Sequence, residues 1–271
     1  LVRRVSFTGG TSVGKHIAQI AADKLMPVSL ELGGKSPNIV LEDADLDHAV
    51  AGVLYGIFSS SGESCIAGSR LFVARPLYEE FMDRLAKGAE KLRVGDPSDP
   101  ATQMGPLISE GHRASVERYV KIGLDEGGVL RTGGVRPTGP LYDKGSYFLP
   151  TIIEGLKNTD TICQEEIFGP VLVAMPFDDL DDLIAQANDS VYALAAGIWT
   201  RDYKKAWHLA KVLKAGNVWI NTYKQFSIST PFGGWRDSGL GREKGRQGIL
   251  QYMEQKAVYW GMNEAPLPWA S

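Results

Sequence analysis

The chain has 271 residues, 44% hydrophobic and 23% charged, which is the composition of an ordinary globular protein with one or two domains. Its 29 basic and 32 acidic side chains give a net charge of −3, so charge provides no reason to expect nucleic acid or an anionic membrane as a partner. No apolar run approaches the roughly 20 residues that span a bilayer. Two cysteines and four scattered histidines argue against a disulfide framework and a transition-metal site, so we expect a reducing, cytoplasmic location and no metal.

The first element resembles half of a phosphate-binding loop. Val5 and Phe7 alternate with polar neighbours, which predicts a half-buried strand, and helical spacing begins at Thr11 after a glycine turn. The run FTGGTSVGKH imitates a Walker A motif, but His16 stands where that motif needs a hydroxyl ligand for Mg²⁺. Free N–H groups at the helix start still suit a phosphate or a dinucleotide. The alternative is a strand-to-helix turn in which glycine serves steric needs alone.

Strand-like and helix-like segments then alternate, which predicts an α/β fold with a mainly parallel sheet. We expect strands near residues 27–32, 38–41, 70–74, 147–154, 171–177, 197–200, 218–221 and 256–260. We expect helices from Asp43 or Asp45 to about Ser59, and over residues 77–92, 110–125, 180–188 and 203–214, with a last short helix after the glycine-rich stretch 232–245. The chain opens inside a strand without a methionine, so we expect it to be the C-terminal part of a longer protein.

Two residues are candidates for catalysis. Cys65 lies among small residues between a helix and a strand, where a cysteine can be accessible and held as a thiolate. The alternative is that it merely packs, as buried cysteines often do. Glu31 ends an apolar strand, where α/β sheets place ligands, and partial burial there would raise its pKa toward that of a general base. A surface glutamate at a strand end is the competing interpretation.

Five segments in this order resemble the aldehyde dehydrogenase superfamily over essentially the whole chain. They are a glycine turn at 7–14, a general-base motif at 31–37, a nucleophile segment at 62–70, a cofactor loop at 165–171 and a C-terminal signature at 231–243. The resemblance implies an aldehyde-dehydrogenase-like catalytic domain with a mainly parallel sheet flanked by helices, plus a remnant of a Rossmann-like cofactor domain. It implies domains at 1–33 (cofactor remnant), 34–253 (catalytic) and 254–271 (oligomerisation strand and tail).

The resemblance also implies roles for residues. Cys65 would attack an aldehyde, hydride would pass to NAD or NADP, and Glu31 would activate the water that releases the acid. The backbone N–H of Cys65 would stabilise the oxyanion, while the asparagine that supplies the family's other donor lies upstream of this segment. The cofactor would contact Gly9, Gly10, Gly14, Leu32, Gly33, Glu166 and Phe168. The substrate tunnel would be lined by Ser64, Ile66, Thr222, Tyr223, Phe226 and Phe232.

The tunnel predicts a neutral or aromatic aldehyde, with Lys224 as a possible contact for a distal carboxylate. Strand 256–260 would add to a neighbouring subunit's sheet, which implies a homo-dimer or homo-tetramer. We expect this chain alone to be inactive, because most of the cofactor domain would precede it. Two rivals remain: a truncated, non-catalytic structural or interaction relative, and a P-loop nucleotidase, which His16 disfavours.

Overall fold

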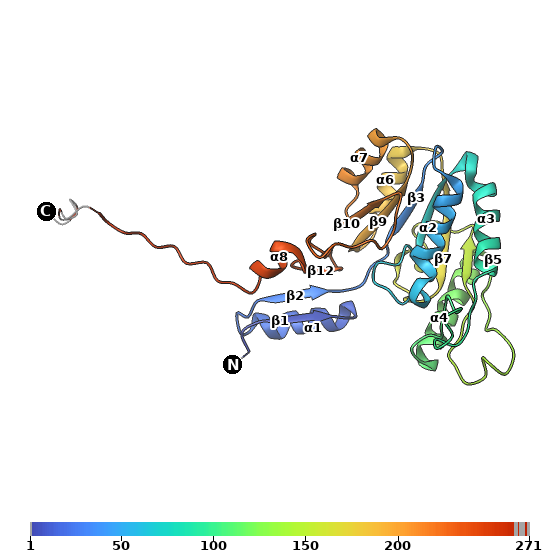
Figure 1. Cartoon of the computed structure of the whole chain (residues 1–271), viewed down its shortest axis with the longest axis horizontal. Coiled ribbons are helices and arrows are strands. Elements are labelled where there is room, and N and C mark those ends of the chain that lie inside the picture. The colour runs from blue at the N-terminus through green and yellow to red at the C-terminus, as the bar shows by residue number, and fades with distance from the viewer. Residues whose placement is uncertain (1, 263–264, 266–268, 270–271) are drawn as a thin grey trace.

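A seven-stranded sheet forms the centre of the larger part of the molecule, which we call the body (Figure 1). The computed structural model describes residues 2–262, 265 and 269. Neighbouring strands are parallel except for the antiparallel edge pair. In spatial order the strands are β10 (Asn217–Ile220), β9 (Ala195–Trp199), β3 (Pro37–Val40), β4 (Arg70–Ala74), β7 (Val171–Phe177), β6 (Thr151–Glu154) and β5 (Val129–Thr132).

Helices cover both faces of this sheet. Successive residues of a strand point to opposite faces, so Ile39 enters one hydrophobic cluster and Val40 the other. One cluster includes residues of α2 (Leu46–Phe58) and α3 (Tyr78–Glu90). The other includes residues of α4 (Glu110–Asp125), α5 (Thr161–Gln164), α6 (Leu180–Asn188) and α7 (Tyr203–Val212). Burial on both faces explains the nearly continuous apolar sequence of the central strands.

A second, smaller sheet lies beside the body, and we call it the small sheet (Figure 1). Its parallel strands β1 (Val5–Thr8) and β2 (Val28–Glu31) flank α1 (Thr11–Ala22) in sequence. The antiparallel β12 (Gly239–Leu240) pairs with β2, and α8 (Gly245–Leu250) follows it. The predicted cofactor remnant at 1–33 is therefore completed by residues from near the other end of the chain.

Short elements connect these parts. The antiparallel pair β8 (Tyr192–Ala193) and β11 (Trp235–Arg236) lies outside both sheets. The 3-10 turns η1 (Ser59–Gly62) and η2 (Arg75–Leu77) follow α2 and β4. Helix α2 begins at Leu46 because the Asp45 carboxylate accepts a hydrogen bond from the N–H of His48 at 3.1 Å, so Asp45 and not Asp43 is its cap.

One strand prediction was wrong in its bounds. Residues 147–150 are not part of a strand, and β6 begins only at Thr151, after Pro150, which has no N–H for a ladder. Residues 256–260 have no strand partner among the described residues of this one chain, so the strand that was predicted to add to a neighbouring subunit stays a prediction. Figure 1 shows it running outward from α8, away from both sheets. The rest of the predicted tail, at 263, 264, 266–268, 270 and 271, lies outside the described residues.

No helix in the described part of the chain is long and apolar enough to cross a membrane.

Candidate active site

A pocket of about 500 Å³ lies where the small sheet meets the body. The small sheet and its connections contribute Thr8, Gly9, Gly10, Glu31, Leu32 and Gly33, and the body contributes Glu63, Ser64, Cys65, Glu166 and Phe168. Residues that are far apart in sequence therefore meet around one cavity. The structure brings together both predicted catalytic residues and most of the predicted cofactor residues.

Cys65 is placed by a tightly constrained turn after α2. Gly62 has φ +72°, and a Cβ on it would lie 2.2 Å from the carbonyl oxygen of Gly169. A Cβ on Gly34 would lie 2.2 Å from the carbonyl oxygen of Cys65, so the base motif and the nucleophile segment are in direct backbone contact. Only glycine allows these approaches. The Cys65 side chain is partly exposed to the pocket.

The surroundings of Cys65 favour the neutral thiol over the thiolate. Burial, followed by the nearby carboxylates of Glu166 and Glu31, raises its pKa to about 11. The backbone N–H groups of Cys65 and Ile66 act in the opposite direction, but their effect is smaller. A thiolate at Cys65 therefore stays a prediction, and the small flanking residues that suggested it do not predict the two carboxylates across the pocket.

Glu31 is a buried carboxylate at the end of β2. Its side chain is 6% exposed, and its Oε2 atom has no hydrogen-bond partner among the described residues. Burial, followed by the charge of Glu243, raises the pKa of Glu31 to about 8, and Arg242 opposes this shift. A carboxyl group with a pKa near the working pH can take and return a proton.

Glu166 and Phe168 border the pocket from the loop before β7. The N–H of Gly34 donates to Oε1 of Glu166 at 2.9 Å, and burial raises the pKa of this carboxyl group. Phe168 has φ +56° and is 39% exposed, an arrangement that a packing residue rarely adopts. A ring nitrogen of His112 lies 2.6 Å from the Phe168 carbonyl oxygen and holds this loop.

The glycine turn leaves room for a phosphate-bearing ligand. A Cβ on Gly10 would meet no atom within 4 Å, so the pocket is open above the start of α1. Gly10 is the N-cap of α1 and has no side chain to occupy the helix N–H groups, which suits an anion. Gly14 does not line the pocket; it lets α1 pack against the side chain of Leu32. With the partly buried carboxylate of Glu166 opposite, these residues fit a dinucleotide.

The predicted tunnel residues divide into two groups. Ser64 lines the pocket, while Phe226 and Phe232 contact each other edge to face, 5.6 Å apart, outside it. Ile66 and Tyr223 are buried in the core, and the Tyr223 hydroxyl donates to the Ile66 carbonyl at 3.0 Å. Neither residue lines the pocket, and the satisfied hydroxyl of Tyr223 is consistent with packing, so their place in a tunnel wall stays a prediction. Thr222 is half-buried beside Tyr223.

Sequence reasoning gave no role to two residues of the matched motifs. Glu243 acts on the pKa of Glu31 and accepts a hydrogen bond from Ser6 at 3.0 Å. Lys35 is 2% exposed, and its Nζ has no hydrogen-bond partner among the described residues, so burial lowers its pKa to about 7. Both residues occur in segments already singled out, but only the fold shows that they approach Glu31 and Glu166.

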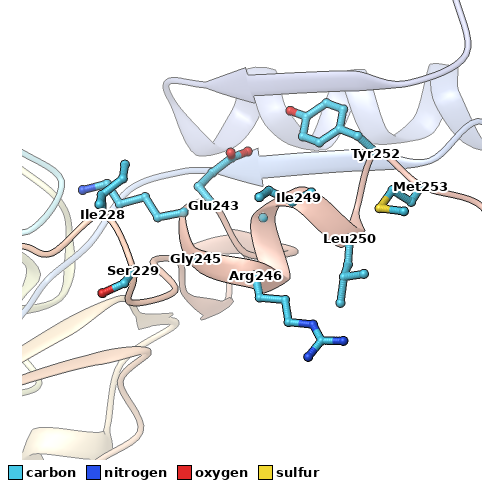
Figure 2. Close-up of a pocket in the computed structure, with 11 residues that line it drawn as sticks. Ile228, Ser229, Glu243, Gly245, Arg246, Ile249, Leu250, Tyr252 and Met253 are labelled. Atoms are coloured by element: carbon cyan, nitrogen blue, oxygen red, sulfur yellow. The ribbon is translucent and has the colours of Figure 1, made fainter.

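A second hollow, of about 890 Å³, lies beside α8 (Figure 2). It is lined by Ile228, Ser229, Glu243, Lys244, Gly245, Arg246, Gly248, Ile249, Leu250, Tyr252 and Met253. None of the predicted catalytic, cofactor or tunnel residues lines it. The pocket between Cys65 and Glu31 is therefore the candidate active site.

Fold and site together define an α/β protein in which a cysteine and a buried carboxylate line one pocket with a glycine turn at the start of a helix. Known proteins resemble this chain. The family described as "Aldehyde dehydrogenase family" matches residues 1–258. Betaine aldehyde dehydrogenase of Brucella melitensis biotype 2 is 44% identical over 99% of this chain and 55% of its own length.

Solved structures agree with this match. Aldehyde dehydrogenase from Bacillus cereus in complex with NAD+ superposes with a TM-score of 0.93 at 43% identity, over 97% of this chain and 52% of that one. A betaine aldehyde dehydrogenase mutant from Staphylococcus aureus, with NAD+ and a BME-modified cysteine, gives a TM-score of 0.96 at 39% identity, over 100% and 55%.

The chain belongs to the aldehyde dehydrogenase family. It spans about half the length of the curated relatives that it matches.

Proposed function

We propose that the full natural protein oxidises an aldehyde to a carboxylic acid and passes the hydride to NAD or NADP. The observation that supports this most directly is the single pocket that holds a cysteine from the body and a buried glutamate from the small sheet. The NAD+ complexes of related structures and the dinucleotide-compatible turn at Gly10 support the cofactor.

The Cys65 thiol loses its proton to solvent, its sulfur bonds to the aldehyde carbon as the carbonyl π bond opens, and the resulting oxyanion lies near the backbone N–H of Cys65. This donor counts among the groups that already favour negative charge on the sulfur. When bound, NAD(P)+ supplies the hydride acceptor and a positive charge. Glu166 would hold the ribose next to the nicotinamide, and Phe168 would support the ring. Loss of hydride from the carbon leaves a thioester on Cys65.

Glu31 then completes the reaction. Its carboxylate takes a proton from a water molecule, the hydroxyl adds to the thioester carbon, and the carbon–sulfur bond breaks to release the acid. Burial of Glu31 raises its pKa to about 8, which makes it a stronger base than an exposed carboxylate. Water is the acyl acceptor in this proposal, and coenzyme A is not required.

The experiment is to trap the thioester. In a Glu31→Gln variant of the full protein, mixed with aldehyde and NAD+, the acyl group should remain on the peptide that contains Cys65. Mass spectrometry of that peptide gives the mass of the adduct, and absorbance of NADH gives the first turnover. Glu63→Gln, another carboxylate of the pocket, is the matched control and should not accumulate acyl-enzyme. Absence of an adduct together with undiminished steady-state turnover would refute the role of Glu31.

The competing proposal is a non-catalytic interaction relative. A natural protein of 29.5 kDa, the mass of this chain, that neither reduces NAD(P)+ with aldehydes nor forms a Cys65 adduct would support this alternative. A larger protein that forms the adduct would exclude it.

Two further features belong to the same proposal. Val258, Tyr259 and Trp260 are strongly exposed apolar residues, with Trp260 84% exposed, and they belong to the extended segment that runs outward from α8 (Figure 1). An exposed segment of this kind can add to the sheet of a second copy, so we propose a homo-dimer or homo-tetramer, tested by light scattering before and after deletion of residues 254–271. Cys65 must stay a free thiol, which supports a reducing, cytoplasmic compartment.

A further inference from the structure

Phe168 has an unusual backbone conformation at the edge of the Cys65 pocket. Its φ of +56° lies in the left-handed region, which costs free energy in a residue that carries a Cβ. Its side chain lines the pocket and is 39% exposed, so burial in the core does not fix the ring. The direction of this ring therefore depends on the contacts that maintain the left-handed backbone.

Helix α4 supplies those contacts from one face. Nε2 of His112 lies 2.6 Å from the carbonyl oxygen of Phe168. One turn further along α4, the fully buried Val116 packs on the next residue of the loop, since a Cβ on Gly169 would lie 2.6 Å from a methyl carbon of Val116. The Gly169 carbonyl borders the η1 turn, where a Cβ on Gly62 would lie 2.2 Å from its oxygen. The peptide between Phe168 and Gly169 is thus packed against both α4 and the η1 turn.

The surroundings of His112 fix the state and the direction of its imidazole. A carbonyl oxygen only accepts, so Nε2 carries the hydrogen and donates it to Phe168. Oε1 of Glu63, which accepts from the N–H of Ile108 at 3.0 Å, lies 3.6 Å from the same nitrogen and favours a hydrogen there. The backbone N–H of His112 donates to Oγ of Ser109, the N-cap of α4, at 3.1 Å. The histidine is therefore held by its own helix and directed toward the loop before β7.

His112 gives the Phe168 carbonyl oxygen its one hydrogen bond within the described part of the chain. The side chains of His112 and Glu63 are 22% and 17% exposed, so water has limited access to this contact. Without the imidazole donor, the left-handed backbone at Phe168 loses the hydrogen bond that offsets its cost. The backbone would then relax toward ordinary φ values, and the ring would change direction, because the allowed side-chain rotamers depend on the backbone.

We propose that His112 is a positioning residue, which holds the ring of Phe168 in the orientation that receives the nicotinamide of NAD or NADP. This inference rests on the proposed aldehyde oxidation, in which Phe168 supports that ring. His112 is not among the residues that line the pocket, so it acts through Phe168 and not on the reacting atoms. Its effect is therefore confined to the nicotinamide end of the cofactor, and the adenosine end should not sense it.

The test measures binding, not turnover, in the full natural protein. Calorimetry gives the Kd of NAD+ and that of ADP-ribose, which lacks the nicotinamide; if the protein uses NADP, the 2′-phosphorylated pair takes their place. In His112→Ala, we expect the Kd of NAD+ to rise about tenfold, because a left-handed state that is populated to about one tenth raises the apparent Kd by that factor. The Kd of ADP-ribose should change by less than about twofold.

Two further variants isolate the hydrogen bond. His112→Gln keeps a side-chain N–H donor and should restore most of the affinity for NAD+. His208→Ala, which removes an exposed imidazole from α7, is the matched control and should bind both ligands as the parent protein does. A loss that His112→Gln does not restore would overturn the proposal. Equal weakening of NAD+ and ADP-ribose in His112→Ala would also overturn it, because a merely structural role affects both ligands.

A double-mutant cycle shows whether the histidine acts through the ring. Phe168→Ala removes the ring, so His112→Ala added to it should change the Kd of NAD+ by less than about twofold. A further loss as large as that in the parent protein would mean that His112 contacts the cofactor itself or supports the fold, and the positioning role would be wrong.

The outcomes separate this inference from the proposed function. If the full protein oxidises aldehydes while His112→Ala binds NAD+ as the parent does, the positioning role is wrong and aldehyde oxidation stands. If the full protein binds neither NAD+ nor NADP+ and oxidises no aldehyde, both proposals fail.

Discussion

The body and the small sheet are built differently although both contribute to one pocket. Strands β3, β4 and β7 are buried along nearly their whole length, and helices cover both faces. In the small sheet, β1 alternates between half-buried and exposed positions, and α1 buries only Gly14 and Ala21 among its twelve residues. The proposed nucleophile thus lies in the well-packed body, while the proposed base and dinucleotide turn lie in the small sheet, one face of which is exposed.

The difference indicates which side of the site is rigid in this chain. Cys65 is held by backbone contacts at Gly34 and Gly62, where added atoms would collide. Glu31 is held by strand pairing to β1 on one side and to the two residues of β12 on the other. Whatever disturbs the small sheet should therefore move the base and the cofactor turn more than the nucleophile.

The largest expected effect is the loss of activity in a variant of Cys65, compared with a variant of the second cysteine of the body. Cys65→Ala in the full protein should lower aldehyde-dependent NAD(P)H formation by roughly 10⁴-fold or more, because no other group replaces a covalent nucleophile. Absorbance of the reduced cofactor measures it. Cys163→Ala, at a fully buried cysteine on α5, is the control and should retain the chemistry. Equal losses in both variants would deny Cys65 its role.

A smaller but still large effect tests the frame around the nucleophile. Arg70 is 1% exposed and donates to Oδ1 of Asn158 and to the carbonyls of Lys35 and Ala187, at 2.8 to 2.9 Å. Arg70→Met leaves these buried acceptors unpaired and should lower the free energy of unfolding by about 3 to 5 kcal/mol. Urea denaturation measures this loss. Arg84→Met, at a surface ion pair with Glu80, should cost less than about 1 kcal/mol.

The pH dependence tests the base in the small sheet. Folding raises the pKa of Glu31 from 4.5 to about 8, so the folded chain binds the proton more tightly than the unfolded chain. The stability gained from that proton is complete below pH 4.5 and is lost as pH rises through about 8. The rate of deacylation depends on pH in the opposite direction, because water activation needs the ionised carboxylate of Glu31. This rate should increase about tenfold per pH unit as the pH approaches 8.

Two measurements follow from these opposite signs. Steady-state rates between pH 6 and pH 9 should show the rising limb, and urea denaturation over pH 4 to 9 should show the falling stability. Glu31→Gln should remove both dependences at once. If the rate of Glu31→Gln still rises with pH, the titration belongs to another group. If the pH dependence of its free energy of unfolding equals that of the parent protein, folding does not raise the pKa of Glu31.

The smallest expected effect compares the two frames directly. Val13 on α1 is 50% exposed, whereas Val53 on α2 is fully buried. In this 271-residue chain, Val13→Ala should change the free energy of unfolding by less than about 0.5 kcal/mol, and Val53→Ala should cost about 2 kcal/mol. Thermal denaturation of the pair is the measurement. A cost at Val13 as large as that at Val53 would mean that another segment or a second copy covers α1, and the contrast between the two frames would then disappear.

The sequence predicted the elements whose periodicity is strong. The alternation at Val5 and Phe7 predicted strand β1, because burial of one face of a strand gives a period of two. The nearly continuous apolar residues of α2 predicted a buried helix. The edge strand β5 was missed, since Val129 and Leu130 are exposed and follow two glycines. The two-residue β12 was also missed, because its pairing with β2 depends on the fold and not on local pattern.

The site shows the same limit. Cys65, Glu31 and Glu166 lie in local motifs and were found by resemblance. The raised pKa of Cys65, the packing role of Tyr223 and the effect of Glu243 on Glu31 arise from residues brought together over long sequence distances. Spacing along the chain carries no information about such contacts.

The pairing of β12 with β2 has a consequence for synthesis of the protein. Strand β2 carries the proposed general base, and its neighbour Gly239–Leu240 leaves the ribosome only after the seven strands of the body have been translated. Loop closure over such a separation is slow and follows the formation of local contacts. The nascent chain therefore exposes one edge of β2 until that neighbour has been translated, and assembly of the proposed catalytic centre must await it.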